Sequence, residues 1–332
     1  MAVVAALEAR ARGLAGLHTT PAGADAERGA DEPIASLRGQ TRASECDTIM
    51  MTWTDLVSTV QRFADQCRAE GSVAWFRGHR DSAFELKSTL HRHVDRLLRD
   101  ASVQPGESER RDLLRQLYKT LYRRFKTDAW PLLDPRERMD WGIIFAMQHY
   151  GLPTRLLDWT EDFACALYFA LLHRAPGRDA AIWVLDPQAL NQVALGRHDL
   201  VALDDDASPG TIDPHPYHPR FVTPQSPLRS IAVSPLFTNP RMTAQRSAFT
   251  VAGDSVLPLE QEFPTLGSAG HLAQLVIPDA ACAEAAAFLA MAGLTAFSFY
   301  PDLQGIAMRH DAEIEEQIAL ARRRYPQMFK QG

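Results

Sequence analysis

The order in which helices and strands are predicted constrains the fold of this chain most. Apolar residues recur at helical spacing over the stretches 54–70, 107–127 and 280–292. Short apolar runs that are typical of strands occupy 73–76, 180–185, 248–251, 272–277 and 295–300. The two kinds of element do not alternate regularly, as they would around a parallel sheet. The sequence therefore predicts an α+β fold.

The middle of the chain carries the clearest helix boundaries. Asp134-Pro135 is typical of a helix start, and Gly151 is typical of a helix end. A short strand should follow, with Thr160 capping the next helix. That helix, over 163–172, is apolar on all sides, so we expect it in the core.

Two segments differ in composition from the rest. Residues 1–50 contain no Phe, Tyr or Trp and cannot bury enough apolar area to offset the entropy of ordering. We expect this segment to be flexible and dispensable, with a natural translation start at Met50 or Met51. Residues 204–240 hold eight of the 21 prolines and predict a long irregular insertion. Residues 51–332 should form one domain around it.

Charge and cysteine content exclude several classes of protein. The chain has 35 Lys+Arg against 41 Asp+Glu, which argues against general binding to nucleic-acid phosphates and leaves only local basic patches. Its four cysteines form no CxxC pair, as is usual in a reducing compartment. No apolar run approaches the ~20 residues that cross a bilayer. We therefore expect a soluble cytoplasmic protein.

Sequence patterns for common cofactors and metals are missing. No GxGxxG follows a strand and no GxxxxGK[ST] is present, so two common phosphate cradles are absent. His91-x-His93 and His215-x-x-His218 have spacings that a metal could use. Neither pair has a nearby cysteine or set of carboxylates, so surface histidines are the simpler interpretation and no metal is expected.

The segment 75–80 is the first of several that are richer in polar groups than a core requires. Within it, Arg77-Gly78 directly follows a predicted buried strand. An arginine in that position presents a rigid fork, and the glycine allows the backbone to approach a phosphate or carboxylate closely. The structural alternative is an arginine that pairs with a carboxylate of the protein itself.

The segment 148–160 is the second. Its polar residues with a possible chemical role are His149, Tyr150, Thr154, Arg155, Asp158 and Thr160. Asp158 and Thr160 should face the same side of an extended strand. The structural alternative is an Arg155–Asp158 ion pair with Thr160 as a helix cap, which leaves His149 and Tyr150 without a role.

Two later segments complete the set. Residues 239–250 lead from the proline-rich region into a strand and include Gln245. A position of this kind suits a loop that closes over a site. Residues 299–305 should end a strand with a turn that holds Asp302, which is the weaker signal.

Together these segments resemble the FRG domain family, which is widespread in bacteria and some phages. The matching motifs are FRG at 76–78, QHYGLPTRLLDWT at 148–160, ALYFA at 166–170, RMTAQ…FT at 241–250 and YPDLQG at 300–305. The resemblance covers roughly residues 54–311, and the central motif is long enough to be specific. Ser247 departs from the family, which tends to have a glycine there. Membership alone does not define an activity.

A more distant resemblance, to ADP-ribosyltransferases of the Arg–Ser–Glu type, implies a function. In those enzymes the arginine of an aromatic-Arg-Gly triplet grips NAD phosphate, as Phe76-Arg77-Gly78 would here. Their Ser-Thr-Ser-like turn and later Gln or Glu are loosely matched by 158–160 and Gln245. The resemblance implies split mixed or antiparallel sheets with flanking helices, and NAD as the substrate. By analogy it also implies a toxin or anti-phage effector.

The same resemblance implies roles for individual residues. Arg77 would hold the pyrophosphate, and Asp158 or Thr160 would position ribose hydroxyls. Gln245 would contact the ribose or the acceptor, whose identity the sequence leaves open. The other expected nucleotide-binding residues are Gly78, His149, Thr154 and Arg155, with Tyr150 or Trp159 stacked on nicotinamide or adenine. We expect Arg77, Asp158, Thr160 and Gln245 to converge on one cleft.

The catalytic carboxylate is the part of the resemblance with the weakest match. Breaking the glycosidic bond builds positive charge on the ribose, which a carboxylate stabilises far better than the amide of Gln245. Glu260-x-Glu262 and Asp302 are alternative acids. A hydrolase that uses His149 and Asp158 is also open. A non-catalytic module that senses a nucleotide on the same scaffold is the alternative outside the enzymes.

Overall fold

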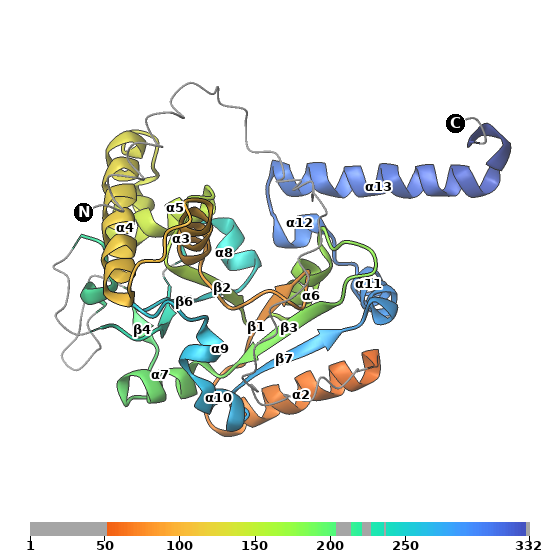
Figure 1. Ribbon diagram of the computed structural model, residues 1–332. Coiled ribbons are helices and arrows are strands. Elements are labelled where there is room, and N and C mark those ends of the chain that lie inside the picture. Colours follow the sequence, from red (N-terminus) through yellow and green to blue (C-terminus); the bar gives the residue numbers. More distant parts are fainter. Residues whose placement is uncertain (1–51, 204–213, 221–226, 236, 330–332) are drawn as a thin grey trace.

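The computed structural model describes residues 52–203, 214–220, 227–235 and 237–329, with a seven-stranded sheet at its centre (Figure 1). The strands lie in the order β4-β5-β6-β2-β1-β3-β7. Their bounds are β1 Trp75–His79, β2 Leu156–Thr160, β3 Ala180–Leu185, β4 Val201–Ala202, β5 Ile231–Ser234, β6 Ser247–Val251 and β7 Leu272–Ile277. All neighbours are antiparallel except β4 and β5. The predicted α+β class is confirmed.

The sheet is weakest at its centre, between β1 and β2. These strands are joined at one pair of residues, Phe76 and Thr160. By contrast, β1 pairs with β3 and β2 pairs with β6 along their full lengths. The expectation of separate sheets is thus wrong, because the described strands form one sheet. Within it, two well-paired halves separate on either side of that single pair.

Two groups of helices cover one face of this sheet. Helices α3 (Thr89–Asp100), α4 (Glu107–Ala129) and α5 (Asp140–His149) pack against β2, β5 and β6. Helices α2 (Trp53–Ala69), α6 (Phe163–Leu171) and α11 (Cys282–Met291) pack against β1, β3 and β7. Each sheet half therefore has its own core cluster on this face.

A third cluster lies on the opposite face. Helices α7 (Pro187–Leu195), α9 (Leu259–Glu262) and α10 (Pro264–Ser268) cover it. Its centre holds the side chains of Trp75, Trp159 and Trp183, which come from neighbouring strands. Because side chains alternate along a strand, residues next to these tryptophans point to the first face.

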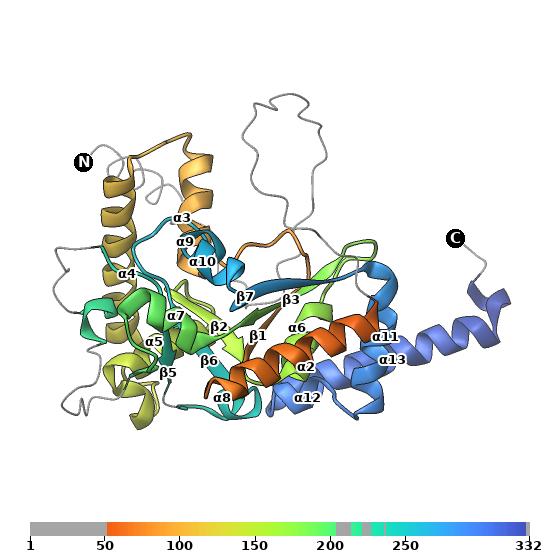
Figure 2. The ribbon, with the colours of Figure 1, turned by 90° about the horizontal axis from the view of Figure 1, so that it is seen from below.

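The remaining helices are short or peripheral. They are η1 Pro135–Arg138, η2 His215–Tyr217, α8 Pro240–Ala244, η3 Asp279–Ala281, α12 Ala296–Phe299, α13 Leu303–Arg324 and η4 Pro326–Phe329. Both ribbon views show α13 extending away from the sheet (Figures 1 and 2). No helix in the described part of the chain combines the length and apolarity needed to cross a membrane.

Several boundaries differ from those predicted, each for a local reason. Asp134 caps the 3-10 helix η1, and α5 begins only at Asp140. Asp162 rather than Thr160 caps α6, because its Oδ1 accepts hydrogen bonds from two backbone amides of the first turn. Residues 295–300 contain helix α12 instead of a strand, since Thr295 and Ser298 form a reciprocal cap.

Only part of the proline-rich region can be compared with the prediction, because residues 204–213, 221–226 and 236 lie outside the described residues. Strand β5 lies inside the predicted 204–240 insertion, and its residues Ile231, Ala232 and Val233 are fully buried in the sheet. The region therefore supplies part of the core. The N-terminal segment 1–50 lies outside the described residues.

Candidate nucleotide-binding cleft

A cleft of about 1110 Å³ opens where β1 and β2 separate. Residues of both strands line it, together with Arg92 from α3 on one side and Phe169 from α6 on the other. The four residues expected to converge, Arg77, Asp158, Thr160 and Gln245, all line this cleft. Segments that are far apart in the sequence thus meet at the weakest junction of the sheet.

Arg77 bridges the two separating strands. Its Nη1 donates a 2.6 Å hydrogen bond to the backbone oxygen of Asp158 and lies 3.8 Å from Oδ2 of the same residue. Its Nε donates to Nε2 of His79 at 3.0 Å. Burial, opposed by the charge of Asp158, lowers the pKa of Arg77 to about 10, so the side chain stays cationic at neutral pH. Among the described residues, none accepts a hydrogen bond from Nη2, which leaves that donor for a ligand.

His79 is a positioning residue, a role that was not predicted for it from the segment 75–80. Its Nδ1 lies 3.2 Å from the backbone oxygen of Phe84, and its Nε2 accepts from Arg77. These partners require a neutral ring with the proton on Nδ1. Burial, and then the charge of Arg77, lower the pKa of His79 to about 3. The imidazole therefore serves as a fixed acceptor that orients the guanidinium.

Asp158 is held from the opposite side by a chain of side-chain hydrogen bonds. Gln148 Nε2 donates to Asp158 Oδ2 at 2.8 Å, and Thr154 Oγ1 donates to Gln148 Oε1 at 2.5 Å. Thr154 is fully buried, whereas about half of the Asp158 side chain is exposed. Thr154 thus orients Gln148, and Gln148 orients a carboxylate that remains open to the cleft.

Gly78 is needed for packing rather than for the approach of a ligand. A Cβ at this position would lie 2.0 Å from the backbone oxygen of Ala166 and 2.6 Å from the backbone nitrogen of Ala170. Both atoms belong to α6, which can lie against β1 only because the side chain is absent. Gly78 therefore sets the distance between the strand and the helix that forms one side of the cleft.

We expect Gly78→Ala to lower the free energy of unfolding by roughly 1–3 kcal/mol, because the backbone of α6 must shift. Urea denaturation measures this change. Gly267→Ala is the matched control, since a Cβ there meets only an ordinary contact at 3.8 Å. Equal stability of the two variants would contradict the packing role.

Thr160 and Gln245 tie the cleft to the segment before β6. Thr160 Oγ1 donates to the backbone oxygen of Gln245 at 2.6 Å and accepts from the backbone nitrogen of Asp162 at 2.9 Å. The Gln245 amide donates to the backbone oxygen of Phe299 at 2.9 Å. Gln245 is the C-cap of α8 and does not lie on a strand. Both residues thus have structural partners at the edge of the cleft.

Helix α6 makes the other side of the cleft apolar. Ala166, Phe169 and Leu172 line it there. Cys165 also belongs to the lining, but it is fully buried, and burial raises the pKa of its thiol to about 12. A thiol of that pKa is not a nucleophile at neutral pH. This side of the cleft suits an aromatic or apolar group of a ligand.

Two predicted nucleotide-binding residues have other roles. The indole of Trp159 is buried in the third core cluster and donates from Nε1 to Thr250 Oγ1 at 3.2 Å, so it is not available for stacking. Arg155 is buried and pairs with Asp254 at 3.2 Å rather than with Asp158. Arg115 binds the same carboxylate at 2.5 Å, which makes Asp254 a structural centre.

His149 and Tyr150 lie at the C-terminal end of α5, next to the cleft lining at Gly151. Their rings are 4.9 Å apart in an edge-to-face arrangement. Tyr150 is 65% exposed, so it is free to contact a ligand. Burial, and then the charge of Arg241, lower the pKa of His149, which keeps the ring neutral at pH 7. Neither ring lines the cleft itself.

The alternative acids lie outside the cleft. Glu260 accepts a hydrogen bond from the backbone of Leu86, and Glu262 accepts two from Ser230. Burial raises the pKa of both glutamates. Asp302 caps α13 and pairs with Arg241 at 2.6 Å. Their structural partners account for all three residues.

Helix α3 contributes a basic side that the sequence analysis missed. Arg92, Arg96 and Arg99 all line the cleft. Their spacing places them on one face of the helix, while Val94 and Leu98 on another face are buried in the core. The spacing was visible in the sequence, but only the fold brings this face opposite α6.

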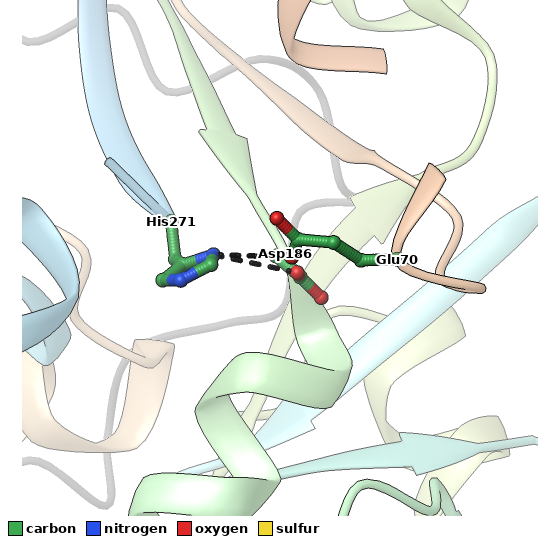
Figure 3. A group of neighbouring side chains, drawn as sticks. All are labelled: Glu70, Asp186 and His271. Atoms are coloured by element: carbon green, nitrogen blue, oxygen red, sulfur yellow. Dashed lines mark ion pairs between the residues drawn. The ribbon is translucent and has the colours of Figure 1, made fainter. Parts of the chain in front are cut away.

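Figure 3 shows a separate group, Glu70, Asp186 and His271. The side-chain atoms with which these residues could bind a metal lie within 4.8 Å of one another. The Asp186 carboxylate already accepts hydrogen bonds from Ser72 Oγ at 2.7 Å and from the backbone of Gln188 at 3.0 Å. Capping of α7 therefore explains its burial, and we assign no metal to the group.

The histidine pairs considered from the sequence do not form metal sites in the described part of the chain. His91 is buried, where Ser88 Oγ bonds its Nδ1 at 2.7 Å, whereas His93 lines the cleft. His218 bonds the backbone oxygen of Asp140 at 3.1 Å, and the side chain of His215 lies outside what is described.

Comparison with known proteins bears on the same segments. The model of the FRG domain matches residues 72–178, about a third of the chain. This range contains β1, α3, β2 and α6, which supply most of the cleft. No curated protein and no solved structure matches the chain.

Proposed function

Because the chain belongs to the FRG domain family and its motifs meet in one cleft, we propose that it binds NAD or a related nucleotide there and transfers ADP-ribose. The observation that carries this proposal is the convergence of Arg77, Asp158, Thr160 and Gln245. The free Nη2 of Arg77 would donate to the pyrophosphate, since a guanidinium is well suited to bind phosphate oxygens.

The two sides of the cleft support an orientation for the nucleotide. Phosphates would lie toward α3, and one ring would lie toward Phe169 on the apolar side. Tyr150, which is exposed next to the lining, would contact the other ring. Asp158 would then lie beside the ribose that carries nicotinamide, where Gln148 holds its carboxylate.

Three carboxylates line the cleft among the described residues: Glu85, Asp95 and Asp158. Asp95 is bonded to Lys87 and Arg110, whereas Asp158 lies next to Arg77. In the proposed reaction the bond between ribose C1′ and the nicotinamide nitrogen breaks, and nicotinamide leaves with the electron pair. An acceptor nucleophile bonds to C1′ and loses its proton. Asp158 would stabilise the positive charge that develops on the ribose.

The second candidate function is a non-catalytic module that senses a nucleotide in the same cleft. One observation favours it: Gln245 occupies the position of the expected glutamate, and its amide is committed to the backbone of Phe299. Such a module would use Arg77 in the same way and would leave the glycosidic bond intact.

Two measurements on the full chain test the proposal. Titration calorimetry with NAD should detect binding below millimolar concentration, and chromatography should detect nicotinamide release. Binding with no release would support the sensing module. Absence of binding at millimolar NAD would reject the proposed transfer of ADP-ribose from NAD.

By analogy with transferases of this kind we also propose a role as a toxin or anti-phage effector. Expression in a bacterial host should then slow growth, and Arg77→Ala should relieve the effect at equal protein level. Unimpaired growth with the unmodified chain would argue against this role.

A further inference from the structure

The basic side of the cleft carries more positive charge than one dinucleotide requires. NAD contains a single pyrophosphate, which Arg77 and one neighbour can neutralise. Three further groups of the lining, Arg92, Arg96 and Arg99, follow one another along α3 over about 10 Å at 1.5 Å per residue. Arg80 and Lys87 extend the lining on the approach to this helix.

These arginines are not explained by partners within the protein. Arg92 donates to the backbone oxygen of Lys87 and to Thr89 Oγ1, and Arg96 lies 3.0 Å from His93 Nδ1. None of the three arginines of α3 forms an ion pair with a carboxylate among the described residues. The neighbouring Asp95 is instead occupied by Lys87 and Arg110.

The three arginines of α3 repel one another, which destabilises the helix locally. Arg92 and Arg96 are four residues apart, and Arg96 and Arg99 are three apart, so each pair brings like charges together on the helix surface. A row of like charges without an ion-pair partner among the described residues indicates an anionic ligand that extends beyond one phosphate group. The interaction with the central site is direct, since the charge of Arg92 contributes, after burial, to lowering the pKa of Arg77.

An exposed aromatic ring lies within the same lining. Phe84 is 45% exposed, and the guanidinium of Arg80 lies 6.0 Å from its ring centroid. A positively charged groove with an aromatic platform is the usual means of binding single-stranded nucleic acid, because the groove follows the phosphates and a base stacks on the ring. Recognition of double-stranded DNA by α3 is disfavoured. One face of the helix forms the side of a cleft and another packs in the core, so the helix cannot enter a major groove.

We propose that the side of the cleft formed by α3 binds a single-stranded nucleic acid, with its phosphates on Arg92, Arg96 and Arg99 and a base on Phe84. This inference rests on the proposed function only where it makes that strand the acceptor of ADP-ribose. The binding of the strand itself requires no NAD.

Fluorescence anisotropy with labelled twelve-nucleotide oligo(dT) and oligo(U) tests the proposal on the full chain without NAD. Binding should weaken with salt, with a slope of about 0.7 per phosphate contact. The double variant Arg96→Glu/Arg99→Glu should bind at least about 10-fold more weakly and lower the slope by about 1.4. Phe84→Ala should lose about 10-fold through stacking alone, with the slope unchanged.

The matched control is Arg123→Glu/Arg124→Glu, which makes the same charge change on the exposed surface of α4, outside the cleft. It should bind within about twofold of the unmodified chain. No binding at 50 mM salt, equal losses in both double variants, or no effect of Phe84→Ala would each overturn the proposal. In the last case, equal competition by heparin would identify a general polyanion site. NAD titration of the unmodified chain separates the two proposals. If the chain binds the strand but does not bind NAD, only the nucleotide function is rejected.

Discussion

Arg77→Ala should weaken NAD binding by about 100-fold or more while the protein remains folded. The guanidinium is the cation that bridges the separating strands, and only 17% of its side chain is exposed. A charge-assisted hydrogen bond in such a site contributes about 1.5–3 kcal/mol, so losing two of them accounts for the expected change. Calorimetry measures the affinity.

Stability should change little, because water in the cleft can replace the donors that Arg77 provides to Asp158 and His79. The melting temperature should fall by no more than about 4 °C. Arg77→Lys keeps the charge without the fork and should lose about 10-fold in affinity. Unchanged affinity in Arg77→Ala would show that the pyrophosphate lies elsewhere.

His79→Ala offers a second variant, at the residue that holds the guanidinium of Arg77. The ring fixes Nε of the guanidinium, so its loss should weaken binding by less than Arg77→Ala does. The conservative variant His79→Gln should bind NAD more tightly than His79→Ala does, because an amide oxygen can accept from Nε of Arg77 in place of the ring nitrogen. A purely structural role would lower stability without this rescue.

How far the sequence could predict this molecule depends on whether a feature is local. Strands β3 and β7 were predicted with their observed bounds, since their apolar runs pack against the helices of the second core cluster. Strand β5 was missed because its four residues stand among prolines, and its burial depends on pairing with β6. The helix at 296–299 was missed because a two-residue cap overrode an apolar run.

The site was predictable as a set of motifs and less so as a set of roles. The motif residues converge as expected, yet strand alternation turns Trp159 into the core while Asp158 faces the cleft. The basic face of α3 could not be assigned, because nothing in the sequence places it opposite α6. The prediction that another group approaches Gly78 closely is confirmed, but that group is the backbone of α6 and not a ligand.

The Asp158→Asn variant separates catalysis from binding, and it should lower nicotinamide release by about 100- to 1000-fold. Asparagine keeps the shape of the side chain, and its amide oxygen can still accept from Gln148 Nε2. The affinity for NAD should therefore stay within about threefold. The loss should appear in kcat rather than in KM, because only the charge that develops in the transition state needs the carboxylate.

Glu85→Gln is the matched control, since it removes one negative charge from the same cleft on a side chain that is 49% exposed. Its turnover should remain within about twofold of the unmodified chain. An equal loss in both variants would mean that the net charge of the cleft, rather than a placed carboxylate, governs the rate. Full activity of Asp158→Asn would exclude Asp158 as the acid.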